Sequence, residues 1–216
     1  MSTHVAATTP YPWPYDGDLA GPGTALLVVA PAGVRAPDGE PVAAVGRLAR
    51  AVHRVGGTVV VATTTVGGRR QRPPGGASTG GASAGDGVLR LLDGEPADHA
   101  VVAGGVDAFY ASPLDRILRD VGVRRLLLAG VGLETGVHST MRDANDRGYE
   151  CLLVLDACVP VDPTLTAASV SMIEMSGGIF GAVGRAADVL AALAEPAVPA
   201  PTVTPPDLAP AQGDQR

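Results

Sequence analysis

Three residue types that carry chemistry recur at helical spacing in the second half of the chain. Glu134, His138 and Arg142 are four residues apart and therefore share one face of a predicted helix. Such a row is either a replacement catalytic or metal-binding cluster, or a charged helix face or subunit contact. One His and one Glu are too few ligands for zinc, which takes four in structural sites. We therefore favour the charged face and predict no metal site.

The other reactive side chains stand apart from one another in the sequence. Cys151 lies in an apolar run and Cys158 beyond its end, so we interpret both as buried or incidental thiols. Asp156 ends the same run, where a structural turn is favoured over a catalytic acid. Asp107 and Phe109 share one loop, and Phe109 either walls a small pocket or packs in the core. The chain contains no lysine at all.

Composition restricts the class of protein. Of the 216 residues, 46% are hydrophobic but only 3% are aromatic, so Val, Leu and Ala must build the core. The formal net charge of −6 argues against nucleic acid or an anionic membrane as a partner. Two cysteines are too few for a disulfide framework, and no apolar run reaches the roughly 18 residues of a membrane span. We therefore predict a cytoplasmic protein.

Short apolar runs alternate with amphipathic segments along most of the chain. We expect strands at residues 25–30, 58–64, 99–103, 124–129, 151–155 and 179–183. We expect helices at residues 41–54, 113–121, 135–147, 163–175 and 185–193. Strands that alternate with helices predict right-handed βαβ units. The fold is thus expected to be a single α/β domain, with a doubly wound, Rossmann-like parallel sheet of about six strands and helices on both faces.

The remaining segments have no periodic apolar face. Residues 1–23 are interpreted as an extended N-terminal arm, and residues 196–216 as a disordered Pro-rich tail. Within the domain, residues 24–195, the stretch 66–98 is expected to be largely a flexible loop. Its glycines are of low complexity, and no GxGxxG or Walker-type loop follows a predicted strand, so we predict no nucleotide or other cofactor.

The stretch from Gly130 to Ala144, GVGLETGVHSTMRDA, resembles the signature of the isochorismatase-like cysteine hydrolases. In that family a Gly-Val/Ile-x-Thr turn leads to a Cys, which is followed by Val, Thr and Arg along a helix. Residues 145–152 (NDRGYECL), 175–184 (MSGGIFGAVG) and 11–19 (YPWPYDGDL) resemble the biuret and ureide amidohydrolase branch. The resemblance extends over about residues 11–193 and implies a small amide or ureide as the ligand.

The family's chemistry uses three residues that converge at the strand ends. A Cys attacks the carbonyl carbon, an Asp exchanges the proton, a Lys supplies positive charge, and N–H groups of the turn before the Cys hold the oxyanion. The matching positions here are Ala30, Ala103 and Gly136. Replacing all three by small neutral residues avoids leaving an unpaired buried charge. The resemblance thus implies a degenerate site whose expected ligand-binding residues are Phe109, Leu133, Glu134, Thr135 and Gly136.

An emptied site is compatible with three functions. The first is a pseudoenzyme, a non-catalytic subunit or regulator that forms a homo-oligomer or pairs with an active paralogue, because members of the family commonly assemble. The second is a divergent hydrolase of amide or ureide C–N bonds that acts through other residues or water. The third is a small-molecule-binding protein that uses the emptied cleft. We favour the first, because losing nucleophile and base together costs on the order of 10⁶-fold in rate.

Overall fold

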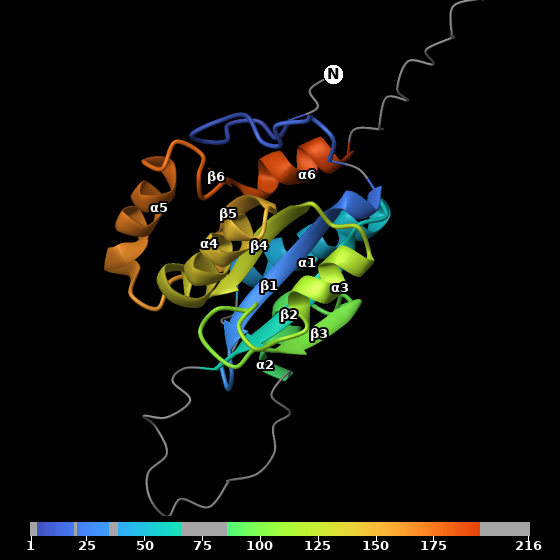
Figure 1. The fold of residues 1–216 in the computed structure, drawn as a ribbon, viewed down its shortest axis with the longest axis vertical. Helices are drawn as coiled ribbons and strands as arrows, with labels where there is room; N and C mark the ends of the chain where they lie inside the picture. Colours follow the sequence, from blue (N-terminus) through green and yellow to red (C-terminus); the bar gives the residue numbers. More distant parts are fainter. Residues whose placement is uncertain (1–3, 20, 35–38, 66–85, 195–216) are drawn as a thin grey trace, which may run out of the picture.

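The computed structural model describes residues 4–19, 21–34, 39–65 and 86–194. Six parallel strands form one sheet in the order β3-β2-β1-β4-β5-β6 (Figure 1). The strands are β1 (Thr24–Pro31), β2 (Thr58–Thr64), β3 (His99–Val102), β4 (Arg125–Val131), β5 (Glu150–Val159) and β6 (Ala182–Gly184). The prediction of a doubly wound α/β fold with a six-stranded parallel sheet is confirmed.

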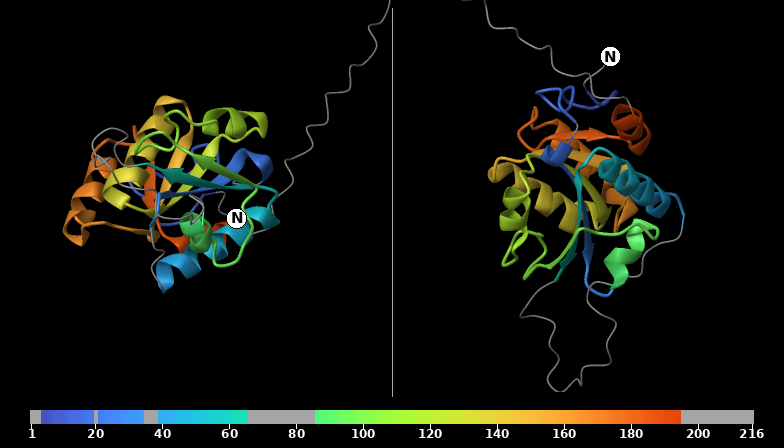
Figure 2. Two further views of the ribbon diagram at one scale, coloured as in Figure 1. Left: turned by 90° about the horizontal axis from the view of Figure 1, so that it is seen from below. Right: turned by 90° about the vertical axis from the view of Figure 1, so that its right-hand side faces the viewer.

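Helices cover both faces of this sheet, as Figure 2 shows. They are α1 (Glu40–Arg54), α2 (Asp86–Leu89), α3 (Leu114–Asp120), α4 (His138–Asp146), α5 (Thr166–Glu174) and α6 (Ala186–Ala194). Successive side chains of β1 alternate between two cores: Val28 faces the layer of α1 and α6, and Val29 faces the layer of α3 and α4. Both faces are covered, which explains the unbroken apolar run at 25–30. Among the described residues, no helix has the length and hydropathy of a membrane span.

Two elements differ from the sequence-based expectation. Within 66–98, residues 86–92 form α2 and a 3-10 turn, and Leu92 is fully buried against α1, so this part is not a flexible loop. Residues 66–85 and the predicted tail 196–216 lie outside the described residues. Strand β5 continues to Val159 instead of ending at residue 155, because the carboxylate of Asp156 is accommodated: it accepts the N–H of Ala186 at 2.8 Å, where α6 begins.

The N-terminal arm is part of the folded unit rather than an extended appendage. Trp13 is fully buried in the core that faces α1 and α6. Thr9 pairs with Val183 of β6, and Figure 1 shows the arm in blue beside β6 and α6. Arg125, which is 1% exposed, donates from Nε to Asp16 Oδ1 at 3.1 Å. The arm therefore closes the edge of the sheet where β4, β5 and β6 begin.

Candidate functional site

The sheet has a topological switch point between β1 and β4. From β1 the chain moves outward through β2 to β3, and it returns to β4 on the other side of β1. In doubly wound sheets, ligands bind in the crevice beyond the carboxyl ends of the strands at such a point. Here β1 ends at Pro31, which pairs with Thr64 at the end of β2, and β4 ends at Val131. We therefore place the candidate site at this edge.

Gly136 lies at this edge, in a π-helical turn (Leu133–Val137) that leads into α4. A Cβ atom built on Gly136 would lie 3.4 Å from the carbonyl oxygen of Val106, and 3.6 Å from both Thr64 Oγ1 and Val29 Cγ1. These are ordinary van der Waals separations, and the backbone of Gly136 is outside the left-handed region. A side chain would therefore fit at position 136, and its absence leaves room at the strand ends.

Ala103 follows β3 and is held against the end of β2. Its N–H donates to the carbonyl oxygen of Thr63 at 2.8 Å, and its own carbonyl accepts from Thr65 Oγ1 at 3.1 Å. The next turn of the loop is held in the same way, because the Thr65 N–H donates to the Gly105 carbonyl at 2.9 Å. The loop thus runs along the end of β2 towards Gly136, so the structure brings positions 103 and 136 to one strand end.

Ala30 belongs to the same edge but its side chain faces the other layer. Its backbone pairs with Thr63, which places it beside the end of β2. Its neighbour Val29 is the β1 residue that approaches Gly136. Since side chains alternate across a strand, Ala30 packs in the core that faces α1. The structure therefore brings the backbone of all three positions to the carboxyl ends of the strands, and the side chain of Ala30 packs in the layer of α1.

The other predicted ligand residues of the turn make structural contacts. Leu133 is buried in the core beneath α4. The carboxylate of Glu134 accepts the N–H groups of residues 161 and 162, at 3.1 Å and 2.6 Å, and so fixes the loop after β5. Thr135 is exposed, and its hydroxyl donates to the Gly132 carbonyl at 3.3 Å. Of the residues predicted in this turn, Gly136 is the one that meets the ends of β1 and β2.

Phe109 packs in the core. Its ring stacks on Tyr149 with the centroids 5.9 Å apart, and the guanidinium carbon of Arg147 lies 4.9 Å from the centre of the Phe109 ring. Tyr149 directly precedes β5, so the Phe109 ring extends towards the sheet edge opposite the candidate site. Of the two interpretations left open by the sequence, these contacts describe core packing.

Glu134, His138 and Arg142 do not converge. His138 is buried, and within the described ranges its Nε2 has no hydrogen-bond partner. Burial and the nearby Arg142 lower the pKa of His138, so the imidazole is neutral at pH 7. Arg142 instead covers the ring of Phe180, with its guanidinium carbon 4.0 Å from the ring centre. No group of three metal-binding side chains occurs in the part of the chain that the structure describes.

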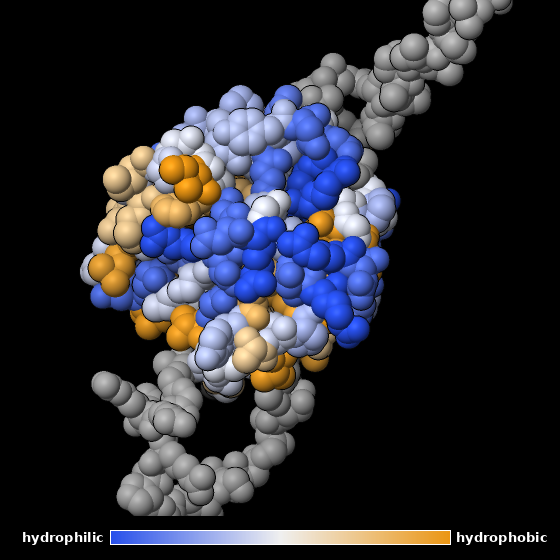
Figure 3. All heavy atoms as spheres, viewed as in Figure 1, coloured by the Kyte–Doolittle hydropathy of each residue, from blue (hydrophilic) through white to orange (hydrophobic). Residues whose placement is uncertain are grey.

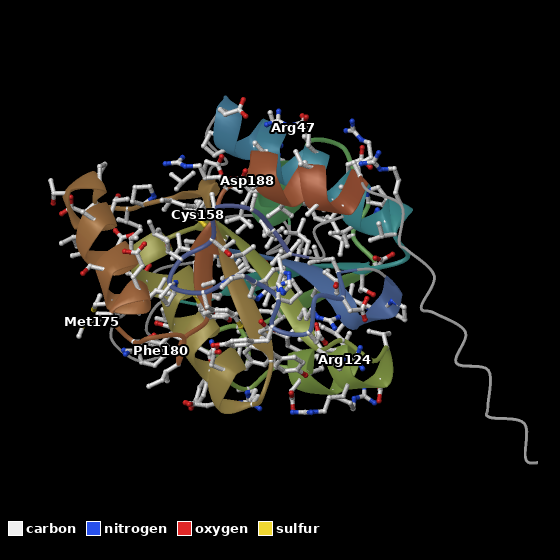
Figure 4. The ribbon with its side chains drawn as sticks, turned by 90° about the horizontal axis from the view of Figure 1, so that it is seen from above. Arg47, Arg124, Cys158, Met175, Phe180 and Asp188 are labelled. Atoms are coloured by element: carbon white, nitrogen blue, oxygen red, sulfur yellow. The ribbon has the colours of Figure 1, made fainter. Side chains whose placement is uncertain are left out.

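Neither cysteine is a candidate nucleophile. Both are buried, and burial raises the pKa of the Cys158 thiol to about 12 and that of Cys151 higher still. The thiolate is the reactive form, so neither sulfur is active near neutral pH. Figure 4 shows Cys158 inside the molecule, whereas Met175 lies at the outer end of α5.

Thr64 is a site residue that sequence reasoning missed. Thr64 is 2% exposed, and its hydroxyl oxygen lies 3.6 Å from the position of a Cβ atom built on Gly136. In the sequence, Thr64 belongs to a β-branched run that indicates a strand and nothing more. The available signal was its place at the carboxyl end of β2, since that end faces the ligand crevice of a doubly wound sheet.

A model of the isochorismatase domain matches residues 30–188, which is well over half of the chain. The chain belongs to the isochorismatase family. It is similar to an isochorismatase family protein from Burkholderia thailandensis, with 25% identity and a TM-score of 0.65 over 80% of this chain and 96% of the other. A similar protein from Desulfovibrio vulgaris has a TM-score of 0.66 at 19% identity, over 81% of this chain and 100% of the other. The resemblance carried by Gly130–Ala144 is thereby confirmed.

Curated relatives of this isochorismatase-family chain include the ureidoacrylate amidohydrolase RutB. The protein from Methylorubrum extorquens is 34% identical over 76 residues, which are 35% of this chain and 31% of the relative. The protein from Methylobacterium radiotolerans is 34% identical over 110 residues, 50% of this chain and 42% of the relative. In these matches the chain spans less than half the length of the relatives. The similarity alone therefore does not assign the relatives' activity to this chain.

In this isochorismatase-family member, the described atoms nearest to a side chain at position 136 carry no formal charge. The three atoms nearest to the missing side chain belong to a hydroxyl, a backbone carbonyl and a methyl group. Such a lining offers one hydrogen-bond donor and one acceptor beside an apolar surface. Among the described residues, no thiolate, carboxylate or ammonium group is one of these nearest contacts.

Proposed function

We propose that this isochorismatase-family protein is a non-catalytic member that binds a small amide or ureide in its emptied site and acts as a subunit or regulator. The observation that carries the proposal is the set Ala30, Ala103 and Gly136, at the positions that match the family's Asp, Lys and Cys. A chain without lysine has no ammonium group to offer from another side chain. Loss of nucleophile and base together removes about 10⁶-fold in rate.

The ligand class is supported by the neutral lining of the site. A primary amide or ureide carries a carbonyl that accepts and an N–H that donates, which complements the Thr64 hydroxyl and the Val106 carbonyl. The named activity of the RutB relatives concerns a ureide, which agrees with this choice.

A role as a subunit is supported by the surface of α5. Large apolar side chains are exposed on and beside this helix: Val161, Leu165, Met172, Met175 and Ile179. Figure 3 shows hydrophobic areas, with hydrophilic areas between them, on the side of the molecule where α5 lies. Several large apolar side chains exposed on one element are typical of surfaces that contact another chain. We propose a second copy of this chain or an active paralogue as the partner.

The proposal is tested by assaying binding and turnover on the same preparation. The full chain is screened by thermal shift against biuret, other ureides and simple amides, and each hit is assayed for ammonia release. We expect stabilisation by at least one amide or ureide and no ammonia above the no-protein background.

Turnover that follows the pure protein through purification would contradict the proposal. It would favour the divergent hydrolase, and loss of that turnover in Glu134→Gln or Asp156→Asn would identify the replacement residue. Both carboxylates make structural hydrogen bonds to backbone N–H groups, so each variant also needs a melting curve.

A further inference from the structure

The exposed face of α5 carries no charged side chain. Its residues share one side of the helix and are small or apolar: Ala167, Ala168, Ser171, Met172 and Met175. The opposite side of the helix is buried through Ser169 and Ile173. A helix on the surface of a globular protein normally presents charged and polar residues to water. This face of α5 is therefore suited to contact with another chain.

The one charged residue of α5 is engaged by the arm. The carboxylate of Glu174 accepts a hydrogen bond from the Thr9 hydroxyl at 2.7 Å, and Glu174 is half-buried. The chain as a whole has a formal net charge of −6, so two copies repel each other wherever negative groups meet. The exposed face of α5 brings no such group to a contact between copies.

Hydrogen bonds hold the segments on both sides of α5 in place. Before the helix, the carboxylate of Glu134 accepts the N–H groups of Val161 and Asp162, at 3.1 Å and 2.6 Å. After the helix, the side-chain amide of Asn145 donates to the Phe180 carbonyl at 2.8 Å. A surface that is ordered before contact loses less conformational entropy when it binds. The exposed apolar side chains beside α5 are therefore carried on a preorganised support.

The charges near the two ends of α5 are opposite in sign. Asp162 is exposed just before the helix, and the exposed Arg142 covers the Phe180 ring in the turn after it, with its guanidinium carbon 4.0 Å from the ring centre. Figure 4 shows Met175, at the C-terminal end of α5, and Phe180 at the same outer edge of the molecule. When two copies of α5 lie antiparallel across a twofold axis, the end with Asp162 meets the end with Arg142. Antiparallel pairing therefore matches charge at both ends.

We propose that the exposed face of α5 is the contact between two copies of this chain, related by a twofold axis with their α5 helices antiparallel. The small side chains of this face allow the two helices to approach closely, and Met172 and Met175 fill the space beside them. The inference rests on the proposed function, because it makes the subunit role specific: the partner is a second copy and not a paralogue.

Sedimentation velocity of the full chain over a dilution series tests this contact. Wild type should change from dimer to monomer on dilution, with a dissociation constant roughly in the micromolar range. Ser171 lies in the middle of the exposed face, so the twofold axis places it opposite its own copy. Ser171→Asp and Ser171→Arg should each weaken dimerisation about tenfold or more, because like charges meet. An equal mixture of the two variants should form dimers again.

The matched control places the same charges on α6, which Figure 1 shows well away from α5. Ala191 is exposed and is the sixth residue of its nine-residue helix, as Ser171 is of α5. Ala191→Asp and Ala191→Arg should leave the dimer unchanged. Met172→Ala adds no charge and removes apolar surface from the contact, so it should weaken the dimer about tenfold. Circular dichroism of each variant checks that it is folded.

The outcomes separate this inference from the proposed function. A wild type that is monomeric throughout the series overturns the α5 contact, and so does a dimer that Ser171→Asp, Ser171→Arg and Met172→Ala all leave intact. Folded variants that stay monomeric when mixed overturn the twofold arrangement. None of these results changes the proposed binding of an amide or ureide without turnover, which the thermal-shift and ammonia assays measure. Ammonia release by wild type would overturn that proposal and leave the contact between copies standing.

Discussion

Two glycines near the switch point differ in what requires them. Gly130 has φ +133°, and a Cβ there would lie 1.9 Å from the carbonyl oxygen of Val29, so β1 and β4 cannot approach each other with any other residue. Gly136 has neither restriction. The fold therefore requires glycine at position 130, whereas position 136 has space for a side chain.

A pair of alanine variants tests this distinction. Gly136→Ala should change the free energy of unfolding by less than about 1 kcal/mol, because the added methyl meets ordinary contacts. Gly130→Ala should cost about 3 kcal/mol or more, or prevent folding, because backbone atoms must move apart. Urea unfolding of both variants is the measurement, and similar losses in the two would contradict our account of Gly136.

Restoring the thiol tests whether position 103 faces position 136. In Gly136→Cys the helical turn alone favours the thiolate, so the thiol pKa should fall below its usual value of about 8.5. Adding Ala103→Lys should lower this pKa further. We leave Ala30 unchanged, because an Asp there would enter the apolar layer of α1. Iodoacetamide reactivity against pH gives both pKa values.

The two native thiols should contribute little to the reaction with iodoacetamide. Cys151 and Cys158 are fully buried thiols with raised pKa values, and a chain in which both are Ala provides the matched control. Equal thiol pKa values in the single and double variants would show that the loop after β3 does not direct residue 103 to the site.

At the scale of elements, the loop after β3 makes three neighbouring contacts with α4 and its C-terminal end. The N–H of Ala108 donates to Thr140 Oγ1 at 3.0 Å, and Phe109 lies under Arg147. Asp107, beside them, accepts the Phe109 N–H at 3.0 Å and faces Asp143 of α4. Since this loop also contains Val106, these contacts help to position the Val106 carbonyl beside Gly136.

Asp107 makes the stability of these contacts between the loop and α4 depend on pH. Burial, together with the neighbouring carboxylate of Asp143, raises the pKa of Asp107 from 3.8 to about 6, although the Phe109 N–H and Arg147 oppose the rise. The folded state holds a proton on Asp107 that the unfolded chain releases near pH 4. The stabilising contribution of this proton is therefore fully present below about pH 4, and it is lost as pH rises through about 6. Asp107→Asn should remove this fall and raise stability at pH 7 by on the order of 1 kcal/mol, allowing for solvent screening.

The matched control is Asp115→Asn on α3, which should behave in the opposite sense. Hydrogen bonds from Tyr149 and Arg119 lower the pKa of Asp115 in spite of partial burial, so its contribution is present at pH 7 and is lost as pH falls. Urea midpoints measured from pH 4 to pH 8 compare the variants. A wild-type profile that is flat between pH 4 and pH 6 would refute the assignment to Asp107.

The arm is held to the sheet by a buried guanidinium. Arg125 is 1% exposed, and its hydrogen bond lowers the pKa of Asp16. Asp16→Asn should destabilise the protein by about 1–3 kcal/mol at pH 7, less than the 3–5 kcal/mol of a fully buried pair because Asp16 is half-exposed. Wild type should lose the same contribution as pH falls below 3.8. In Glu40→Gln, which breaks the exposed pair with Arg47, the change should be under 0.5 kcal/mol.

For the molecule as a whole, the sequence predicted the sheet because its strands are short apolar runs that alternate with amphipathic segments. It did not predict α2, since a four-residue helix has no measurable period. It ended β5 too early, because Asp156 interrupts the apolar pattern and its partner Ala186 is distant in sequence. It treated the Pro-rich arm as separate, although Trp13 completes the core.

The candidate site was predictable in position but not in its lining. The turn around Gly136 was identified because its neighbours follow a family pattern, and Ala103 was placed by its distance from Asp107. The directions of Phe109 and Glu134 depend on partners far along the chain, Tyr149 and the loop after β5, which no local pattern reveals.

The buried arm has a practical consequence for how this protein unfolds. Trp13 is the single tryptophan of the chain, and the arm holds it fully out of water. Its fluorescence emission therefore reports one event, the release of the arm, while far-ultraviolet circular dichroism reports the helices. Coincident midpoints of the two signals mean that arm and sheet melt as one cooperative unit. A red shift of the emission with a lower midpoint than the circular dichroism signal means that the arm detaches from a core that is still folded.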